Sequence, residues 1–132
     1  KKDHKIKYQI DDKLNIYGSK KEIESAFVNL ITNAIRYTDK NGFISISWGL
    51  INGLPIFEVK DTGSGIEQKH INRITERFYR VDKDRSRDSG GTGLGLSIVK
   101  NIIKQHDGEL KITSDLGIGS SFKLIFNKES IA

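Results

Sequence analysis

Five stretches of the chain alternate apolar and polar residues, and this period of two predicts β-strands. In the first stretch Ile6, Tyr8 and Ile10 fall on one side, which predicts a half-buried strand, and the segment 14–18 is a candidate partner for it across a turn at 11–13. Asn52 and Gly53, a dipeptide typical of two-residue hairpin turns, stand between the second and third stretches. The five predicted strands cover residues 4–10, 43–50, 55–61, 109–115 and 120–126.

The segment before the hairpin repeats apolar residues at steps of three and four, which predicts a long helix. Ser19 stands three residues before Glu22, the spacing of a capping box, so we expect the helix to begin there and to run to about Thr38. Its predicted core-facing residues are Ile23, Ala26, Phe27, Leu30, Ile31 and Ala34.

A second helix is predicted from Leu94 to His106, ending before Gly108. Residues 67–80 carry a short helical pattern. The polar segment 81–91 has one apolar residue at its start, so we expect a mobile loop there. The predicted core-facing residues of the second helix are Leu94, Ile98, Val99, Ile102 and Ile103.

This order of strands and helices predicts a two-layer α/β sandwich, in which a mixed sheet carries its helices on one face. The chain has 132 residues, a length that suits a single domain, and it contains no internal repeat. We therefore treat residues 1–132 as one domain.

Composition excludes several classes of protein. The chain has no cysteine, which excludes disulfides and zinc sites made of thiolates. No apolar run approaches the roughly 20 residues that cross a bilayer. The net charge of +5 invites a nucleic-acid interpretation, but the lysines are scattered among acids rather than gathered in a stripe. A small anionic ligand explains the charge equally well.

Polar residues line the other side of the first helix, including two asparagines one turn apart. Asparagine is a mediocre helix former, so the pair needs a reason. The side is either a solvated surface or one wall of a polar ligand site. In the second case an amide oxygen suits Mg²⁺, arginine suits phosphate and tyrosine packs on a base. These residues are Ser25, Asn29, Asn33, Arg36 and Tyr37.

A first glycine cluster, DTGSGI, follows the third predicted strand at residues 61–66. Gly63 and Gly65 would let the backbone turn tightly and approach a ligand closely. Asp61, at the end of the strand, could accept a hydrogen bond from an exocyclic amine such as that of adenine. Ordinary turn chemistry explains the same pattern, so the cluster alone leaves both interpretations open.

A second cluster, GGTGLGLS, occupies residues 90–97 and leads into the second helix. A P-loop would need lysine after its last glycine, and dinucleotide and protein-kinase loops would need a third glycine where Leu96 stands. What remains is a flexible hinge, or a glycine-rich turn whose backbone N–H groups bind phosphate at a helix N-terminus.

With these two clusters, the segments NLITNAIRYT (29–38) and ERFYRVD (76–82) complete a set of four. In order, the set resembles the N, G1, F and G2 boxes of the catalytic domain of histidine kinases, over nearly the whole chain. The resemblance implies the Bergerat (GHKL) ATP-binding fold, with ATP and Mg²⁺ as cofactors. The stretch 74–100 looks especially like the sensor kinases of the phosphate regulon.

The resemblance assigns a role to each matching residue. It makes Asn33 the Mg²⁺ ligand and places Asn29 and Arg36 near the phosphates, so these three form the catalytic set. It places Asp61 on the adenine amine and makes residues 81–91 the ATP lid. The implied nucleotide-binding residues are Asn33, Arg36, Tyr37, Asp61, Gly63, Gly65, Ile66, Phe78, Tyr79, Arg80, Gly91, Thr92, Gly93, Leu94, Gly95 and Leu96.

Two features distinguish this chain from its ATPase relatives. Gyrase-type ATPases carry an acid that activates water where this chain has Asn29, and an amide is no general base at neutral pH. A phosphoaccepting histidine is also missing, because His4, His70 and His106 lie in the wrong sequence contexts. The chain is therefore expected to bind Mg·ATP and to pass the γ-phosphoryl group to a histidine on a separate dimerisation hairpin.

The same resemblance implies the cellular setting. The chain is expected to be a monomeric fragment of a membrane-anchored homodimer, with this domain in the cytoplasm at the bacterial inner membrane. Its partners would be the hairpin domain and a response regulator, with no direct contact to nucleic acid. The alternatives are an ATPase of the same fold, a protein serine kinase and, more remotely, a basic nucleic-acid-binding module.

Overall fold

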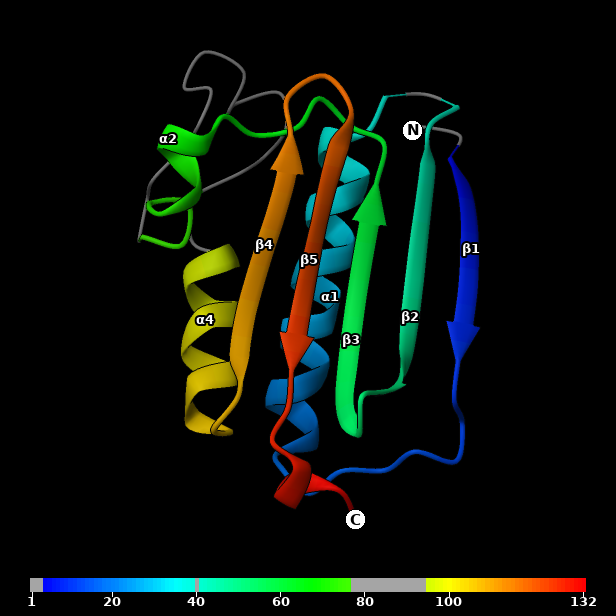
Figure 1. Ribbon diagram of the computed structural model, residues 1–132, viewed down its shortest axis with the longest axis vertical. Coiled ribbons are helices and arrows are strands. Elements are labelled where there is room, and N and C mark those ends of the chain that lie inside the picture. Colours follow the sequence, from blue (N-terminus) through cyan, green and yellow to red (C-terminus); the bar gives the residue numbers. More distant parts are fainter. Residues whose placement is uncertain (1–3, 40, 77–94) are drawn as a thin grey trace.

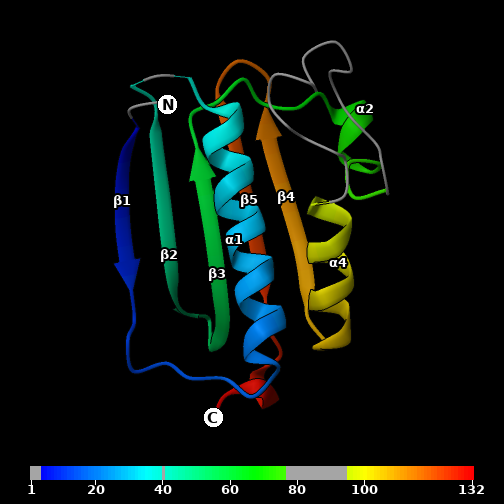
Figure 2. The same cartoon turned by 180° about the vertical axis from the view of Figure 1, so that it is seen from behind.

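The computed structural model describes residues 4–39, 41–76 and 95–132. The described elements form a five-stranded sheet, and the two long helices lie on one face of it (Figures 1 and 2). This confirms the predicted α/β sandwich. The elements are β1 (Lys5–Ile10), α1 (Lys20–Tyr37), β2 (Phe43–Ile51), β3 (Leu54–Asp61), α2 (Gln68–Ile71), α4 (Gly95–Gln105), β4 (Glu109–Asp115), β5 (Gly119–Ile125) and the 3₁₀ turn η1 (Lys128–Ser130).

The strands lie in the order β1-β2-β3-β5-β4. β1 pairs with β2 in parallel, and every other pair is antiparallel, so the sheet is mixed as predicted. Side chains paired across the strands form rows that alternate between the helix-covered face and the open face. Two rows on the covered face build the core across β2 to β5: Ile46, Val59, Phe122 and Ile112, and Trp48, Phe57, Leu124 and Leu110. Tyr8 and Ile10 of β1 continue these rows to the edge of the sheet.

Helix α1 supplies the other half of the core. Ala26, Leu30 and Ala34 are buried on the stripe that the sequence predicts. The ring of Phe27 stacks on that of Phe57, with a centroid distance of 3.8 Å, and Trp48 closes the cluster from the side. This packing fixes α1 against the middle of the sheet.

His106, at the end of α4, connects the two helices. The predicted cap holds, because Ser19 Oγ accepts a hydrogen bond from Glu22 N at 3.3 Å. The backbone N–H of Ser19 donates to His106 Nε2 at 3.1 Å, so Nε2 carries no proton here. Nδ1 is then the protonated nitrogen, and it donates to Ile102 O at 2.8 Å. Both ring nitrogens of His106 are therefore engaged.

The helix α4 ends before Gly108, as predicted, but Asp107 adopts the left-handed conformation, with φ of 58°. Gly108 N donates to Ile103 O at 2.9 Å, which completes the helix end. Glycine is required at 108 for a different reason: an added Cβ would lie 2.5 Å from Ile125 O. Close contact with β5, rather than a special φ, explains this glycine.

Two predictions about the first strand are wrong. The segment 14–18 does not pair with β1, since Ile16 bridges to Ile131 and β1 pairs with β2. β1 is also exposed rather than half-buried. Its apolar side chains point to the helix-covered face, but neither α1 nor α4 extends over this edge of the sheet (Figure 2). The exposed fractions are 39% for Ile6, 66% for Tyr8 and 50% for Ile10.

The predicted core face of α4 also needs a correction. Val99 and Ile103 are buried and Ile102 packs against the core, but Ile98 is 41% exposed. Ile98 lies one residue from buried Val99 and therefore points away from the sheet. Leu94 and the loop 81–91 lie outside the described residues.

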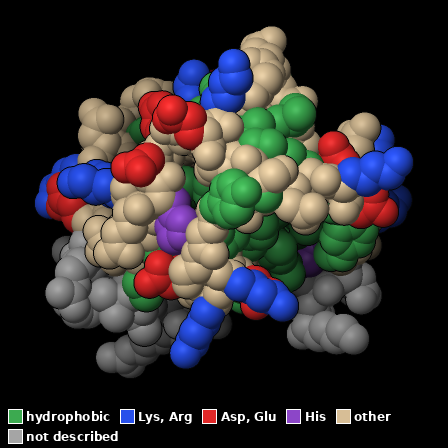
Figure 3. All heavy atoms as spheres, turned by 90° about the horizontal axis from the view of Figure 1, so that it is seen from below, with side chains coloured by type: hydrophobic (Ala, Val, Ile, Leu, Met, Phe, Trp, Pro, Cys, Tyr) green, Lys and Arg blue, Asp and Glu red, His purple; other side chains and the backbone are tan. Residues whose placement is uncertain are grey.

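The end of the molecule that holds the C-terminus exposes apolar side chains around the β2–β3 turn (Figure 3). Leu50 is 51% exposed and Ile51 is 46% exposed. Acidic and basic side chains are mixed around the rim of this face rather than separated (Figure 3). Among the described residues, this face of the molecule therefore shows no basic stripe that would suit nucleic acid.

Candidate functional site

One helix-facing row of the sheet becomes polar at its far end. It runs Ile6, Ile44, Asp61, Ser120 and Ser114, so three strands each contribute a polar side chain. Asp61 closes β3 and is only 8% exposed, and Ser120 is equally buried. Residues opposite each other on neighbouring strands lie about 5 Å apart, so these side chains form one polar cluster.

Asp61 is held by backbone groups. The N–H of Gly63 donates to its Oδ1 at 2.8 Å. Burial raises the pKa of this carboxyl above its usual 3.8, and hydrogen bonds from the backbone N–H groups of Gly63 and Ser120 act in the opposite direction. Ionising a buried carboxyl costs free energy. A ligand that donates a hydrogen bond to the carboxylate reduces this cost.

The glycines around Asp61 are required by the chain's own backbone. A Cβ on Gly63 would lie 2.5 Å from Tyr37 O, and one on Gly65, whose φ is 77°, would lie 2.2 Å from Asp115 O. An added Cβ on Gly119 would lie 2.1 Å from Asp61 O. From the sequence, we expect Gly63 and Gly65 to let the backbone approach a ligand closely. In the structure their close neighbours are the end of α1 and the β4–β5 turn.

The polar side of α1 lies beside the start of α4. Asn29, Asn33 and Arg36 are half-buried, whereas Ser25 is exposed. Asn29 Nδ2 donates to Ser25 O at 2.8 Å, and an added Cβ on Gly95 would lie 3.2 Å from Asn29 Oδ1. The structure therefore brings residues of the first helix and of the second glycine cluster into contact.

Tyr37 ends α1 beside the loop that follows Asp61. Its side chain is 48% exposed, and its carbonyl oxygen approaches Gly63 as described above. Ile66 and Leu96 are half-buried and pack against the core. The implied residues outside the described part of the chain are Phe78, Tyr79, Arg80, Gly91, Thr92, Gly93 and Leu94.

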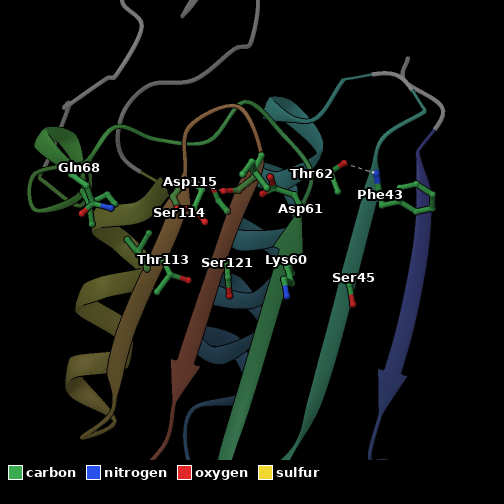
Figure 4. Close-up of a pocket in the computed structure, with 15 residues that line it drawn as sticks. Phe43, Ser45, Lys60, Asp61, Thr62, Gln68, Thr113, Ser114, Asp115 and Ser121 are labelled. Carbon is green, nitrogen blue, oxygen red and sulfur yellow. Dashed lines mark hydrogen bonds between the residues drawn. The ribbon is translucent and has the colours of Figure 1, made fainter.

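A cavity of about 560 Å³ opens at the end of the sheet near Asp61 (Figure 4). Asp61, Ser114 and Ser120 line it, and it continues over the open face, where Ser45, Lys60, Ser121 and Thr113 form one row across four strands. Among the described residues that line it, none comes from α1. The cavity thus reaches Asp61 from the open face of the sheet, and the asparagines of α1 do not line it.

Sequence reasoning missed three residues around Asp61. Thr62 Oγ1 accepts from Phe43 N at 3.0 Å, which fixes the start of the loop (Figure 4). Ser114 and Ser120 join the site from β4 and β5, which the sequence places about 55 residues further along. The alternation of each strand indicates that both serines share a face with apolar residues, but only the strand order reveals that this face ends at Asp61.

Comparison with known proteins decides the family. Residues 18–130 match the family model described as "Histidine kinase-, DNA gyrase B-, and HSP90-like ATPase". The chain belongs to this ATPase family. Membership implies ATP binding, and it agrees with a buried carboxylate beside an asparagine-bearing helix.

Curated relatives of this ATPase domain include sensor kinases. The chain is 42% identical over 131 residues to the phosphate regulon sensor protein PhoR of Pseudomonas aeruginosa, covering 99% of the chain and 30% of the relative. It is 46% identical over 105 residues to the histidine-protein kinase ArlS of Staphylococcus aureus, covering 80% and 23%. The chain therefore corresponds to the catalytic ATPase domain of histidine kinases and spans less than a third of these relatives' length.

Solved structures agree on the fold. The mycobacterial sensor histidine kinase MprB superposes with a TM-score of 0.80 at 22% identity, over 93% of this chain and 80% of that one. The catalytic domain of the histidine kinase ThkA gives a TM-score of 0.79 at 26% identity, over 95% and 79%. The mixed sheet with helices on one face is therefore the fold of these catalytic domains.

We predict that Gly119→Ala destabilises the ATPase domain by about 3 kcal/mol or more, because the new methyl group overlaps Asp61 O and the backbone must shift. Gly117→Ala is the matched control in the same turn. Its φ is also positive, at 81°, but nothing lies within 4 Å of the added Cβ, so it should cost about 1 kcal/mol. Urea unfolding measures both, and equal losses would contradict the packing that we describe.

The raised pKa of Asp61 predicts a pH dependence. The folded state binds the proton of this carboxyl more tightly than the unfolded state, so Asp61 reduces stability as pH rises above 3.8 through its folded pKa. Relative to wild type, Asp61→Asn should become more stable over that window and then level off. Urea unfolding between about pH 3.5 and 7 tests this, with the exposed Asp39→Asn as control. If the difference in unfolding free energy between Asp61→Asn and wild type stays the same at every pH, the raised pKa of Asp61 is contradicted.

Proposed function

We propose that this chain is the ATP-binding catalytic domain of a longer sensor histidine kinase. It binds Mg·ATP and supplies the γ-phosphoryl group to a histidine on a separate dimerisation hairpin of the same protein. The observation that carries the proposal is the buried carboxylate of Asp61, which closes a strand next to the helix that bears Asn29 and Asn33. Identity of 42% to a sensor kinase over 99% of the chain supports it.

Asp61 is the proposed adenine contact. One of its oxygens accepts from Gly63 N, and carboxylates have further lone pairs to accept from an exocyclic amine. Tyr37 ends α1 next to the same loop, and Ile66 lies beyond its glycines, so both are proposed to flank the base. Gly63 and Gly65 keep this loop close to its neighbours and so define the shape of the pocket.

Asn33 is the proposed Mg²⁺ ligand. An amide oxygen is a hard donor, and Mg²⁺ usually keeps waters and phosphate oxygens alongside one or two protein ligands. Within the described residues no group of three His, Cys, Asp or Glu side chains could hold a metal ion, so a site there would depend on the nucleotide's own phosphates. Arg36, half-buried on the same side of α1, is proposed to offset phosphate charge.

Asn29 favours transfer to a protein over hydrolysis. Its amide donates to Ser25 O and packs on Gly95, and an amide does not take a proton from water at neutral pH. Phosphoryl transfer depends mainly on positioning and charge neutralisation, which Asn33, Arg36 and backbone N–H groups of residues 91–96 are proposed to supply. Phe78, Tyr79 and Arg80, with the lid at 81–91, are proposed to complete the site.

The acceptor histidine is proposed to lie outside this chain. His106 has both ring nitrogens engaged, as described above, and His4 Nε2 contacts Thr38 O at 2.8 Å. His70 lies half-buried in the short helix α2. His4 and His70 do not lie on a long helix, and both ring nitrogens of His106 are engaged. Each of the three is therefore a poor phosphoacceptor.

The setting is proposed from the relatives. The full protein would be a membrane-anchored homodimer of the bacterial inner membrane, acting on a response regulator, with this domain in the cytoplasm as a monomeric unit. Identity of 42% to two proteins named phosphate regulon sensors favours a role in the response to phosphate starvation. No described helix is long and apolar enough to cross a membrane.

Calorimetric titration with AMP-PNP and Mg²⁺ tests the proposed nucleotide site. The chain should bind the adenine nucleotide more tightly than the guanine analogue, and Asp61→Asn should weaken adenine binding about tenfold or more, since a hydrogen bond to a charged acceptor is lost. The exposed Asp39→Asn should leave binding unchanged. Equal affinities for the two nucleotides in the wild-type chain would refute the adenine contact.

A further inference from the structure

Ser114, near the end of β4, makes three hydrogen bonds around the nucleotide pocket. Its Oγ accepts from the backbone N–H of Ile66 at 2.7 Å and donates to Gly119 O at 3.0 Å. It also lies 2.8 Å from Ser120 Oγ. One hydroxyl thus joins the loop after Asp61 to the β4–β5 turn and to the residue opposite Asp61.

These contacts fix which oxygen donates. A serine hydroxyl has one proton to donate and two lone pairs that accept. Ser114 donates its proton to Gly119 O and accepts from the N–H of Ile66 with one lone pair. Its contact with Ser120 is therefore a hydrogen bond only if Ser120 donates. All three contacts are made in this arrangement. The proton of Ser120 therefore points to Ser114.

This orientation determines what the Ser120 hydroxyl offers to a ligand. With its proton directed at Ser114, Ser120 Oγ presents only lone pairs to its other neighbours. Ser120 is paired directly with Asp61 on the helix-covered face, and the ionised carboxylate of Asp61 also only accepts. Ser114 shares this covered row with Asp61 and Ser120, and Figure 4 shows Asp61 and Ser114 at this end of the sheet. A ligand that reaches the covered row meets two acceptors, which match an amine and oppose a carbonyl oxygen.

We propose that Ser114 is a positioning residue for base selection, which holds the Ser120 hydroxyl in its accepting orientation so that the pocket prefers a 6-amino purine over a 6-oxo purine. The proposal rests on the proposed nucleotide site at Asp61. In Ser114→Ala the proton of Ser120 is released and can turn to donate to a 6-oxo group. Selectivity then falls although Asp61 is intact.

The test is the ratio of the dissociation constants of two probes, AMP-PNP and the corresponding inosine analogue, each with Mg²⁺. In Ser114→Ala the preference for the adenine probe should fall roughly three- to tenfold, the range expected when one neutral hydrogen bond changes partner. Ser114→Thr keeps Oγ in a residue that strands favour, and it should restore the wild-type ratio.

Ser47→Ala is the matched control. It removes a hydroxyl from β2, on the open face and outside the residues that line the cavity, and should leave the ratio unchanged. If Ser114 only supported the fold, Ser114→Ala would weaken both probes equally and the ratio would stay at its wild-type value. That result, or a ratio that Ser114→Thr fails to restore, would overturn the proposal.

The two proposals fail in different ways. If the wild-type chain binds neither probe, the nucleotide site at Asp61 is wrong and base selection by Ser114 is wrong with it. If the wild-type chain prefers the adenine probe and Ser114→Ala keeps the same preference, only the role of Ser114 is wrong. A calorimetric series on the wild type and three variants separates these results.

Discussion

The burial of one carboxylate at the end of a strand is the constraint on which this site depends. Asp61 is nearly inaccessible, and the backbone closes around it so tightly that Gly63, Gly65 and Gly119 leave no room for a Cβ. Three parts of the chain meet there: the end of α1, the loop after β3 and the β4–β5 turn. The burial of the carboxyl raises its pKa, and the backbone N–H groups of Gly63 and Ser120 act in the opposite direction by donating to it.

The rest of the molecule supports this arrangement. The stack of Phe27 on Phe57 holds α1 against the middle of the sheet, and His106 ties the start of α1 to the end of α4. With both helices fixed, the asparagine side of α1 faces Gly95, the first described residue of α4. The histidine kinase ATPase domain thus places its proposed metal ligand and its proposed base contact on separate elements that share one core.

Sequence patterns predicted most of the fold, because period-two and period-3.6 repeats report which side of an element is apolar. The first helix, its cap at Ser19 and the Asn52–Gly53 hairpin all have local causes. Errors arose where burial depends on a distant element. Ile6, Tyr8 and Ile10 face the correct side, but only the strand order shows that neither long helix covers them.

The candidate site divides in the same way. Asp61 and the asparagines carry a signal in one short segment, so they could be named from the sequence. Ser114 and Ser120 could not, since serine in a strand is unremarkable until the pairing of β3 with β5 and of β5 with β4 puts both on the row of Asp61. Gly63 and Gly65 are places of close approach, as the sequence indicates, and the chain's own backbone lies close to both. Their approach to a ligand stays a prediction.

The central claim is that the covered row ending in Asp61, Ser120 and Ser114 binds the base while α1 binds the phosphates. The most direct test is an NMR titration of the ¹⁵N-labelled chain with AMP-PNP and Mg²⁺. The account predicts the largest shifts at the amides of Gly63 and Ser120 and at the side-chain amides of Asn29 and Asn33. Shifts confined to the open-face row of Ser45, Lys60 and Ser121 would place the nucleotide on the wrong side of the sheet and contradict it.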